Sequence, residues 1–320
     1  MGPTTIPLAG LQPIYSVADV DRASGDSAAQ RNEGLKGWYD RMRKLGGSRY
    51  IVKPSDHHSL DELYEVSPNF GEVIDDLKKS LALAVSGNEA VNFTPILLIG
   101  EPGLGKTYFA RKLADALATG FEFVSMNSLT AGWVLTGASA GWHNARPGKV
   151  AQTLIEGDFA NPVMVLDEVD KAGGDHRYDP MGALYTLLER DTAARFKDEF
   201  IDVDMDASHI LWIATANDET AIPDPVLNRM NVYAIERADG EGARRIALSV
   251  YREILEQHRW PFPPEPSEAM LDRLMTIPAR DIKKLLLDAF GTARLAGRDF
   301  LVPEDIDAKK LCGRRTRVGF

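Results

Sequence analysis

A glycine-rich run in the first third of the chain has the residue types that bind a phosphate chain. It reads GEPGLGKT and fits the pattern G-x-x-x-x-G-K-[ST]. Glycines let the backbone curl until successive N–H groups face one anion, and the N-terminus of a following helix adds a positive dipole end. We expect Lys106 to bridge the β- and γ-phosphates of ATP and the Thr107 hydroxyl to hold Mg²⁺. The alternative is a glycine-rich turn without a ligand. The predicted nucleotide-binding residues are Gly100, Glu101, Pro102, Gly103, Leu104, Gly105, Lys106, Thr107 and Tyr108.

Two adjacent carboxylates follow an apolar run further along the chain. The sequence VMVL at 163–166 leads directly into Asp167 and Glu168. The carboxyl end of a buried strand is where sheets of this kind bind ligands. We therefore expect Asp167 to hold the Mg²⁺ and Glu168 to orient and polarise the attacking water. The alternative is an acidic strand end that only faces solvent.

Three further polar residues are predicted to act on the phosphates. Asn217 ends the run ILWIATAND and is expected to position water or sense the γ-phosphate, although an Asn after a strand is more commonly a turn former. Arg229 is expected to reach the γ-phosphate bound by a neighbouring subunit, and Arg280 to touch the phosphates of its own subunit. Judged alone, either arginine is more typical of a surface ion pair.

These residues need a sheet that gathers strand ends, and the apolar pattern predicts one. Runs with strand character cover 95–100, 121–124, 163–166, 210–215 and 232–235, with helical stretches at 108–118, 150–157 and 182–190 between them. Strands that alternate with helices indicate an α/β domain, with a five-stranded parallel sheet and helices on both faces. After residue 238, helical stretches at 240–257, 267–275 and 282–295 predict a small all-helical lid domain.

The sequence before the first predicted strand divides in two. Residues 1–34 are rich in Gly, Pro, Ser, Ala and Asp without a sustained period, and they predict a flexible arm to which we assign no fold. Residues 35–90 predict a helical linker, with helices at 35–45 and 70–84. The nucleotide-binding domain is then expected over 91–237, the lid over 238–311 and a basic tail over 312–320.

Composition disfavours several classes of function. The 320 residues carry a net charge of −10, which argues against binding nucleic acid through its phosphates. No run approaches the roughly 18 apolar residues of a membrane span, and the start lacks a signal peptide, so we expect a cytoplasmic protein without a membrane partner. The single cysteine, Cys312, excludes an internal disulfide and a multi-cysteine metal site.

The order and spacing of the motifs resemble the AAA+ ATPases, and most of all the ATPase module of the Lon proteases. The matching segments are GEPGLGKT, VMVLDEVDK, ATAND, PDPVLNRM and PARDIKK, together with RPGK at 146–149, and the resemblance covers roughly residues 68–300. It implies a P-loop NTPase fold. It also implies that Gly100 to Thr107 are the Walker A loop, Asp167 and Glu168 the Walker B pair, Asn217 sensor 1, Arg229 the arginine finger and Arg280 sensor 2.

The same resemblance implies where substrate is contacted. In Lon-like rings an aromatic-hydrophobic pair shortly before Pro-Gly-Lys grips polypeptide in the central pore, and counting back gives Trp142 and His143. The alternative is that Trp142 packs onto its own domain. The loop at 172–179, with its His-Arg-Tyr sequence at 176–178, is either a second pore contact or a plain surface loop. Lon proteases also carry a Ser-Lys peptidase domain; we expect none in this chain and therefore no peptidase activity of its own.

The favoured hypothesis is a ring-forming ATPase, expected to be a hexamer, that remodels or unfolds polypeptide substrates with a separate peptidase or adaptor as partner. A nucleic-acid motor of the helicase or loader type is the first alternative, and it should show a basic pore or an added DNA-binding domain. A nucleotide-gated scaffold with little turnover is the second. The presence of Glu168, Asn217 and Arg229 together disfavours a scaffold, because a pure switch does not need all three.

Overall fold

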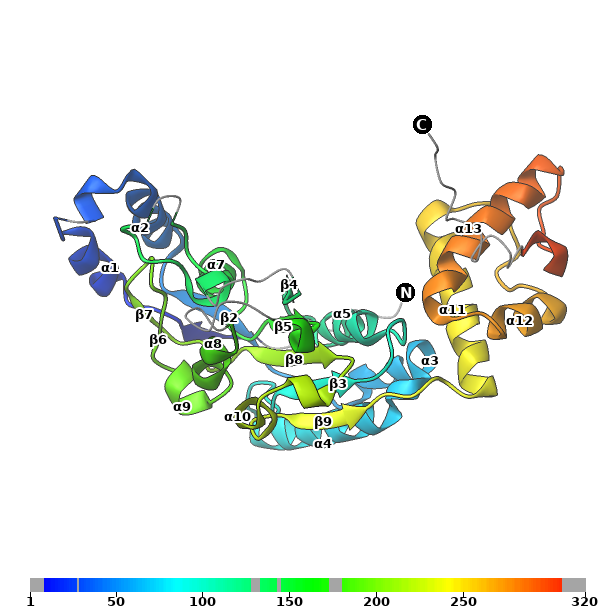
Figure 1. Cartoon of the computed structure of the whole chain (residues 1–320), viewed down its shortest axis with the longest axis horizontal. Helices are drawn as coiled ribbons and strands as arrows, with labels where there is room; N and C mark the ends of the chain where they lie inside the picture. The colour runs from blue at the N-terminus through cyan, green and yellow to red at the C-terminus, as the bar shows by residue number, and fades with distance from the viewer. Residues whose placement is uncertain (1–8, 28, 128–132, 143–144, 173–179, 307–320) are drawn as a thin grey trace. The chain divides into compact units, whose positions relative to one another are not determined.

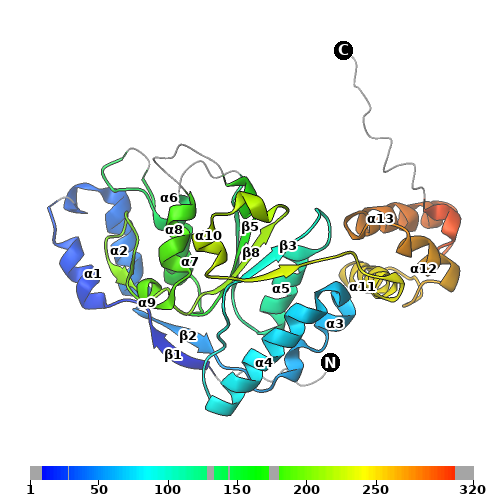
Figure 2. The same ribbon diagram turned by 60° about the horizontal axis from the view of Figure 1, so that its bottom comes forward.

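The computed structural model describes residues 9–27, 29–127, 133–142, 145–172 and 180–306. These residues form two compact units (Figures 1 and 2). Unit 1 comprises residues 9–60, 75–100 and 110–234, and unit 2 comprises residues 61–74, 101–109 and 235–306. Within the described ranges, no helix is long and apolar enough to cross a membrane.

A five-stranded parallel sheet lies at the centre of unit 1. Its strand order is β4-β5-β8-β3-β9, and every neighbouring pair is parallel. The three inner strands are mostly apolar and almost entirely buried, as expected for a sheet covered on both faces. This confirms the predicted sheet. The strands are β3 (Ile96–Ile99), β4 (Phe121–Ser125), β5 (Val163–Asp167), β8 (Leu211–Ala216) and β9 (Asn231–Ala234).

The helices between these strands have apolar residues three or four positions apart, which form one buried face. In α7 (Lys149–Glu156), for example, Val150, Ala151, Leu154 and Ile155 recur at helical spacing and all are buried. The short hairpin of β6 (Phe196–Lys197) and β7 (Asp204–Met205) was not predicted, because two-residue strands leave no periodic signal. The remaining helices of this region are α4 (Gly71–Gly87), α5 (Lys106–Ala116), α6 (Trp133–Thr136), α8 (Pro180–Leu187), α9 (Arg190–Ala193) and α10 (Asp224–Leu227), with 3₁₀ turns η4 (Val169–Lys171) and η6 (Glu219–Ala221).

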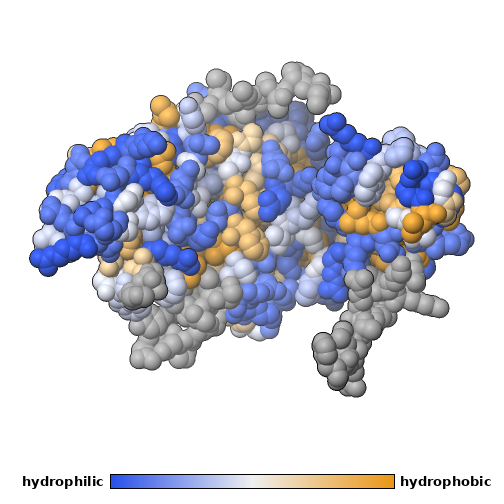
Figure 3. Space-filling view, turned by 90° about the horizontal axis from the view of Figure 1, so that it is seen from above, coloured by the Kyte–Doolittle hydropathy of each residue, from blue (hydrophilic) through white to orange (hydrophobic). Residues whose placement is uncertain are grey.

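Unit 2 is mainly helical, as predicted for the C-terminal part of the chain. Its core lies between α11 (Gly240–His258), α12 (Glu268–Met275) and α13 (Ala279–Leu295), with 3₁₀ turn η7 (Pro303–Asp305) beside it. The N-cap side chains of Asp239 and Ser267 accept hydrogen bonds from the first turns of α11 and α12. The short helix α3 (Leu63–Val66) and η3 (Pro68–Phe70) pack on α11. Figure 3 shows that some hydrophobic side chains stay on the surface of this unit. Leu295 on α13 is 92 % exposed.

The N-terminal region differs from the expectation of an arm without a fold. Strand β1 (Ala9–Pro13) pairs antiparallel with β2 (Ser48–Val52), and α1 (Val17–Ser24), η1 (Ala29–Arg31) and α2 (Glu33–Leu45) lie between them, with η2 (His58–Leu60) after β2. Ile14, Tyr15 and Val20 are buried in the core of unit 1. A local reading missed this because β1 gains its partner only from a strand about 35 residues later, and non-local pairing leaves no local period.

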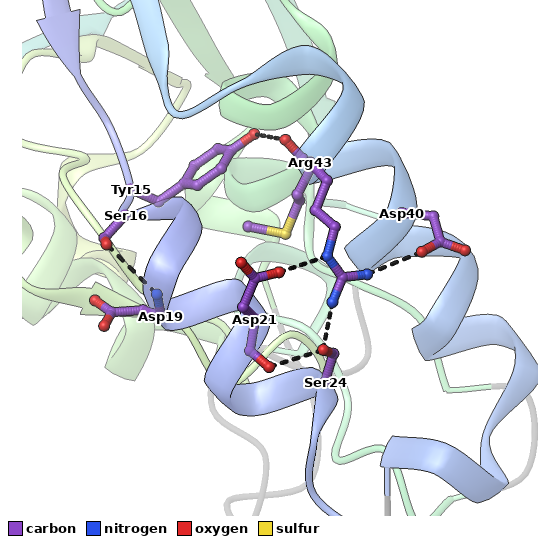
Figure 4. Close-up of polar contacts among 8 residues, drawn as sticks. Tyr15, Ser16, Asp19, Asp21, Ser24, Asp40 and Arg43 are labelled. Carbon is purple, nitrogen blue, oxygen red and sulfur yellow. Dashed lines mark hydrogen bonds and ion pairs between the residues drawn. The ribbon is translucent and has the colours of Figure 1, made fainter.

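A polar network fastens α1 to α2 (Figure 4). The Arg43 guanidinium on α2 donates to the Asp21 carboxylate at 2.7 Å and to the Ser24 hydroxyl on α1, and also to Asp40 at 2.9 Å. The Tyr15 hydroxyl donates to the Met42 carbonyl at 3.1 Å. Figures 1 and 2 show α1 and α2 side by side, with α7 next to α2. The segment predicted as an arm and the start of the predicted linker are thus a folded part of unit 1.

Candidate functional site

The carboxyl ends of three neighbouring strands define the candidate site in unit 1. Strand β8 lies between β3 and β5, with Ile99 opposite Ala216 and Leu166 opposite Ala214. The Gly100 N–H donates to the Ala216 carbonyl at 3.2 Å. Because parallel strands end at one edge, this register brings together three of the predicted site positions, Gly100, Asp167 with Glu168, and Asn217.

A buried threonine organises the two carboxylate residues. The Thr215 hydroxyl on β8 donates to Asp167 Oδ1 at 2.8 Å and accepts the Glu168 N–H at 3.0 Å. Thr215 is 2 % exposed, so neither bond is weakened by competing water. Sequence reasoning did not identify Thr215. The signal available was the single hydroxyl residue in the otherwise apolar run ILWIATA at 210–216.

Glu168 is held in an unusual conformation. Its backbone lies in the left-handed region with φ 57° and ψ 51°, which is costly for a residue with a side chain. The Asn127 amide donates to Glu168 Oε2, and the Ser125 hydroxyl donates to Asn127 Oδ1 at 2.9 Å. Strain maintained in this way is characteristic of functional sites. Asn127 was missed by the sequence reasoning, although it follows β4 much as Asn217 follows β8.

The glycine-rich loop from Glu101 onward belongs to unit 2 and has the curled backbone that its sequence predicts. Gly103 and Gly105 adopt φ values of +90° and +87°, which only glycine reaches without strain. Lys106 is 8 % exposed, and its ammonium donates to the Glu101 carbonyl at 3.2 Å, within the loop itself. Helix α5 begins at Lys106, directly after the curled backbone. The first N–H groups of a helix have no partner within the helix and can therefore bind an anion.

Arg280 lies beside this loop within unit 2. A Cβ on Gly103 would come within 2.8 Å of Arg280 Cδ, so the two residues are in close contact. The arginine side chain is 62 % exposed, and its Nε lies 3.6 Å from Asp281 Oδ2, a weak surface pair. Among the residues that the structure describes, this pair with Asp281 is the ion pair of the guanidinium, most of which faces solvent beside the loop.

A cavity of about 160 Å³ adjoins the loop in the same unit. The Asn69 amide spans its side, donating to the Leu104 carbonyl at 3.3 Å and to the Glu236 carbonyl at 3.2 Å. Arg237 donates twice to Glu101 Oε2, at 2.8 and 3.2 Å. One part of the wall is aliphatic and includes Leu104, Ile246, Ile277, Pro278 and Ile282.

Arg229 lies away from the other predicted residues of unit 1. It precedes β9, so it is at the amino edge of the parallel sheet, whereas Asp167 ends β5 at the carboxyl edge. Its guanidinium donates to the Pro225 carbonyl at 2.6 Å and lies 3.3 Å from a Glu189 carboxylate oxygen. It lines a groove of about 660 Å³ formed by α4, the 89–95 segment and the 187–193 segment. The structure does not bring Arg229 to the carboxylates of its own chain.

The two predicted substrate loops are only partly described. Trp142 is 54 % exposed, so about half of its surface faces solvent. His143 lies outside the described residues, as does most of the 172–179 loop with its residues 176–178.

Comparisons with known proteins agree with this geometry. Residues 96–236 match the family model for the ATPase family associated with various cellular activities (AAA). The Lon protease of Malacoplasma penetrans is 34 % identical over 189 residues, which are 58 % of this chain and 24 % of the relative. Lon protease 1 of Thermus thermophilus is 31 % identical over 236 residues, which are 73 % of this chain and 27 % of the relative. The chain thus spans about a quarter of the length of these curated relatives.

A solved structure of a RuvB mutant from Thermotoga maritima shares the fold. It superposes with a TM-score of 0.51 at 15 % identity, covering 74 % of this chain and 67 % of that chain. At this identity the likeness concerns the fold alone. Together with the strand order and the glycine-rich loop, these matches establish that the chain carries an AAA ATPase domain with a P-loop NTPase fold, similar to the ATPase module of Lon proteases.

Proposed function

We propose that this chain is a Mg²⁺-dependent ATPase that works as a ring-forming motor on polypeptide substrates. The observation that carries the proposal is the shared strand edge in unit 1. There Thr215 and Asn127 fix Asp167 and Glu168, and β8, which carries Thr215, also pairs with β3, the strand that precedes the glycine-rich loop. A surface acidic pair without a function would not need two separate side chains to hold it in a strained backbone conformation.

The residues suit a magnesium nucleotide. We expect the N–H groups from Gly100 to Tyr108 and the Lys106 ammonium to bind the phosphates, with the Thr107 hydroxyl and the Asp167 carboxylate holding Mg²⁺. Hydroxyl and carboxylate oxygens are the ligands this hard cation prefers. When bound, Mg²⁺ neutralises phosphate charge. The hydrogen bond from Thr215 orients one oxygen of Asp167 and so directs the carboxylate.

Hydrolysis then depends on residues of this chain that handle water. Glu168 is the group expected to accept a proton from the attacking water, and Asn217 is expected to position that water or contact the γ-phosphate. Asn127 holds Glu168 by one carboxylate oxygen, which leaves the second oxygen to orient water. Arg280, which contacts Gly103, is expected to touch the phosphates and report their state to the helical unit.

The cavity beside the loop is the best candidate for the adenine ring. It is lined on its apolar side by Ile246, Ile277 and Ile282, and it directly adjoins Gly103 and Leu104 of the phosphate-binding loop. A flat ring gains most from burial against such aliphatic walls. The Asn69 side chain is already bound to two carbonyls and thus keeps the cavity wall in place.

The position of Arg229 supports a ring. Arg229 lies at the sheet edge opposite to Asp167, which supports a role on a nucleotide bound by another subunit rather than by its own. A head-to-tail contact of this kind closes into a ring when the rotation allows it, and we propose a hexamer. In the isolated chain Glu189 pairs with Arg229, and we expect this ion pair to open when the neighbouring phosphates are in reach.

A polypeptide is the proposed substrate, and a separate peptidase or adaptor the proposed partner. Two features support this: the relatives are named as proteases, and Trp142 exposes an aromatic ring within a glycine-flanked segment. The net charge of −10 weighs against a nucleic-acid substrate. The RuvB likeness concerns fold alone and does not offset that charge.

Phosphate release by the purified protein tests the proposal. We expect Mg-dependent turnover that is stimulated by an unfolded polypeptide such as casein, and a loss of at least about 100-fold in the Glu168→Gln variant with ATP binding retained. Glu265→Gln, the same substitution at an exposed glutamate, is the matched control and should behave as wild type. Equal, negligible release from wild type and Glu168→Gln would instead support a nucleotide-gated scaffold. Stimulation by DNA but not by casein would support a nucleic-acid motor.

A further inference from the structure

Trp142 lies near the tip of a loop whose two ends touch. The Ala138 N–H donates to the Arg146 carbonyl at 3.2 Å. A Cβ on Gly148 would lie only 2.4 Å from the Gly137 backbone nitrogen, so nothing larger than glycine fits at this closure. Because the two ends are in contact, the residues that hold them also restrict the position of Trp142.

A buried carboxylate ties one end of this loop to a neighbouring turn. Asp198 Oδ2 accepts the Gly148 N–H at 2.7 Å, and Oδ1 accepts the N–H groups of Phe200 and Ile201 at 2.9 and 3.0 Å. Asp198 has no exposed surface, and this burial raises its pKa to about 6. A Cβ on Gly137 would lie 2.4 Å from the same carboxylate, so Asp198 also contacts the other end of the loop.

The turn after Asp198 holds that other end by its backbone as well. The Glu199 N–H donates to the Thr136 carbonyl at 2.8 Å, at the last residue of α6. The 198–201 turn is therefore bonded to the residues that precede and follow the loop. Burying a carboxyl group costs free energy unless hydrogen bonds replace those it made to water. Asp198 accepts three hydrogen bonds from the backbone, and these stabilise the junction.

Helix α2 supports both the loop and the turn. The Asn32 amide nitrogen donates to the Ala140 carbonyl at 3.1 Å, two residues before Trp142, while Asn32 Oδ1 caps the helix by accepting the Leu35 N–H at 3.1 Å. Further along α2, the Tyr39 hydroxyl donates to the Ile201 carbonyl at 2.8 Å. The Arg43 network of Figure 4 joins α1 to α2. The N-terminal region is thus connected to the loop through α2 and its N-cap residue Asn32.

We propose that Asp198 and Asn32 are positioning residues that hold Trp142 in solvent, ready to contact a polypeptide. This inference rests on the proposed function, in which Trp142 is a substrate contact. A loop ordered in advance loses less conformational entropy when it binds, so a rigid frame lowers the polypeptide concentration needed for half-maximal stimulation. We call Asn32, Asp198 and the 198–201 turn the frame of this loop. The frame contains none of the residues proposed to act on ATP, so hydrolysis without substrate should not depend on it.

Two substitutions break the frame at single contacts. Asp198→Asn keeps one oxygen for the Phe200 and Ile201 N–H groups but turns an amide N–H₂ toward the Gly148 N–H. Asn32→Asp keeps the helix cap but replaces the donor to the Ala140 carbonyl by an acceptor. Asp202→Asn is the matched control: it lies in the same hairpin, its carboxylate is 75 % exposed, and its φ of +51° suits asparagine.

The first measurement is ATP hydrolysis at pH 8 as a function of casein concentration, well below the melting temperature of each variant. We expect the half-maximal casein concentration to rise at least about fivefold for Asp198→Asn and for Asn32→Asp, with unchanged hydrolysis in the absence of casein. Asp202→Asn should match wild type. A purely structural role would lower the melting temperature without moving this concentration. An unchanged half-maximal concentration in both frame variants overturns the proposal.

A second measurement does not depend on substrate. The fluorescence anisotropy of Trp142 is obtained as the difference between each protein and the same protein carrying Trp142→Phe. We expect faster local motion of this tryptophan in Asp198→Asn and Asn32→Asp than in wild type or Asp202→Asn. If casein stimulates neither wild type nor Trp142→Phe, the proposed substrate is refuted, while the anisotropy still decides whether these residues position the loop. Equal anisotropy in all proteins refutes the positioning itself.

Discussion

Replacing Thr215 by valine should damage both the stability and the activity of this protein. Valine has nearly the same shape, so no cavity forms in the buried strand β8. What is lost is the hydroxyl that donates to Asp167 at 2.8 Å and accepts the Glu168 N–H at 3.0 Å. The substitution thus isolates two hydrogen bonds at the candidate site.

The size of the effect follows from those two bonds. A hydrogen bond to a charged group contributes about 1.5–3 kcal/mol, and a buried N–H left without a partner costs about 1–3 kcal/mol. Asp167 is only half-buried, so water can replace part of its lost bond, and we expect a net loss of about 2–4 kcal/mol. In a unit of this size that corresponds to a fall in melting temperature on the order of 10 °C. Turnover should fall about 10- to 100-fold, because both carboxylate residues lose their fixed orientation.

Thermal melting and phosphate release on the same preparations measure both effects. The control is Thr292→Val, in which an exposed hydroxyl loses only a bond to the Asp288 carbonyl one helical turn earlier, and it should change stability by less than about 0.5 kcal/mol. If Thr215→Val melts and turns over ATP like wild type, Thr215 does not organise the carboxylates.

Three further predictions concern separate residues. Asn127→Ala should leave Glu168 without its amide partner and change turnover at least about fivefold while ATP binding stays within twofold of wild type, as measured by steady-state hydrolysis and nucleotide titration. Burial raises the pKa of Asp198 from 3.8 to about 6. Between these pH values the folded protein binds more protons than the unfolded one, so the free energy of unfolding falls as the pH rises. From pH 4 to pH 7 wild type should lose up to about 3 kcal/mol of stability relative to Asp198→Asn, as measured by denaturant unfolding at each pH. Arg229→Ala and Glu168→Gln proteins should each be inactive, yet a mixture should recover roughly a quarter of wild-type turnover if the arginine acts on the neighbouring subunit, whereas no recovery would contradict that role.

The sheet and its ligand-binding edge were predictable because their signals are local. Each of the five strands is a short apolar run next to a helix with its own period, and the glycine-rich loop follows the first of them. A parallel sheet then requires that strand ends such as Asp167 and Asn217 share an edge. These features need no knowledge of distant contacts.

The parts that escaped prediction depend on contacts between distant residues. Strand β1 has no period of its own and is recognisable only through its pairing with β2. The roles of Asn127 and Thr215 require the order of the strands, since each reaches a carboxylate on the neighbouring strand β5 or just beyond it. Asp198 lies 50 residues from Gly148, and no spacing rule joins an acid in a short hairpin to the start of a helix.

The most direct test of a single magnesium-nucleotide site is electron paramagnetic resonance of Mn²⁺ bound in place of Mg²⁺. With ATP and the Glu168→Gln protein, the Mn²⁺ signal should show hyperfine coupling to phosphorus if, as proposed, the loop and Asp167 act on the same phosphates. The coupled signal should be lost when Asp167→Asn is added, and lost again when Lys106→Ala is added instead. Mn²⁺ that binds without phosphorus coupling, or equally well after both changes, would show that the glycine-rich loop and the carboxylates do not serve one nucleotide.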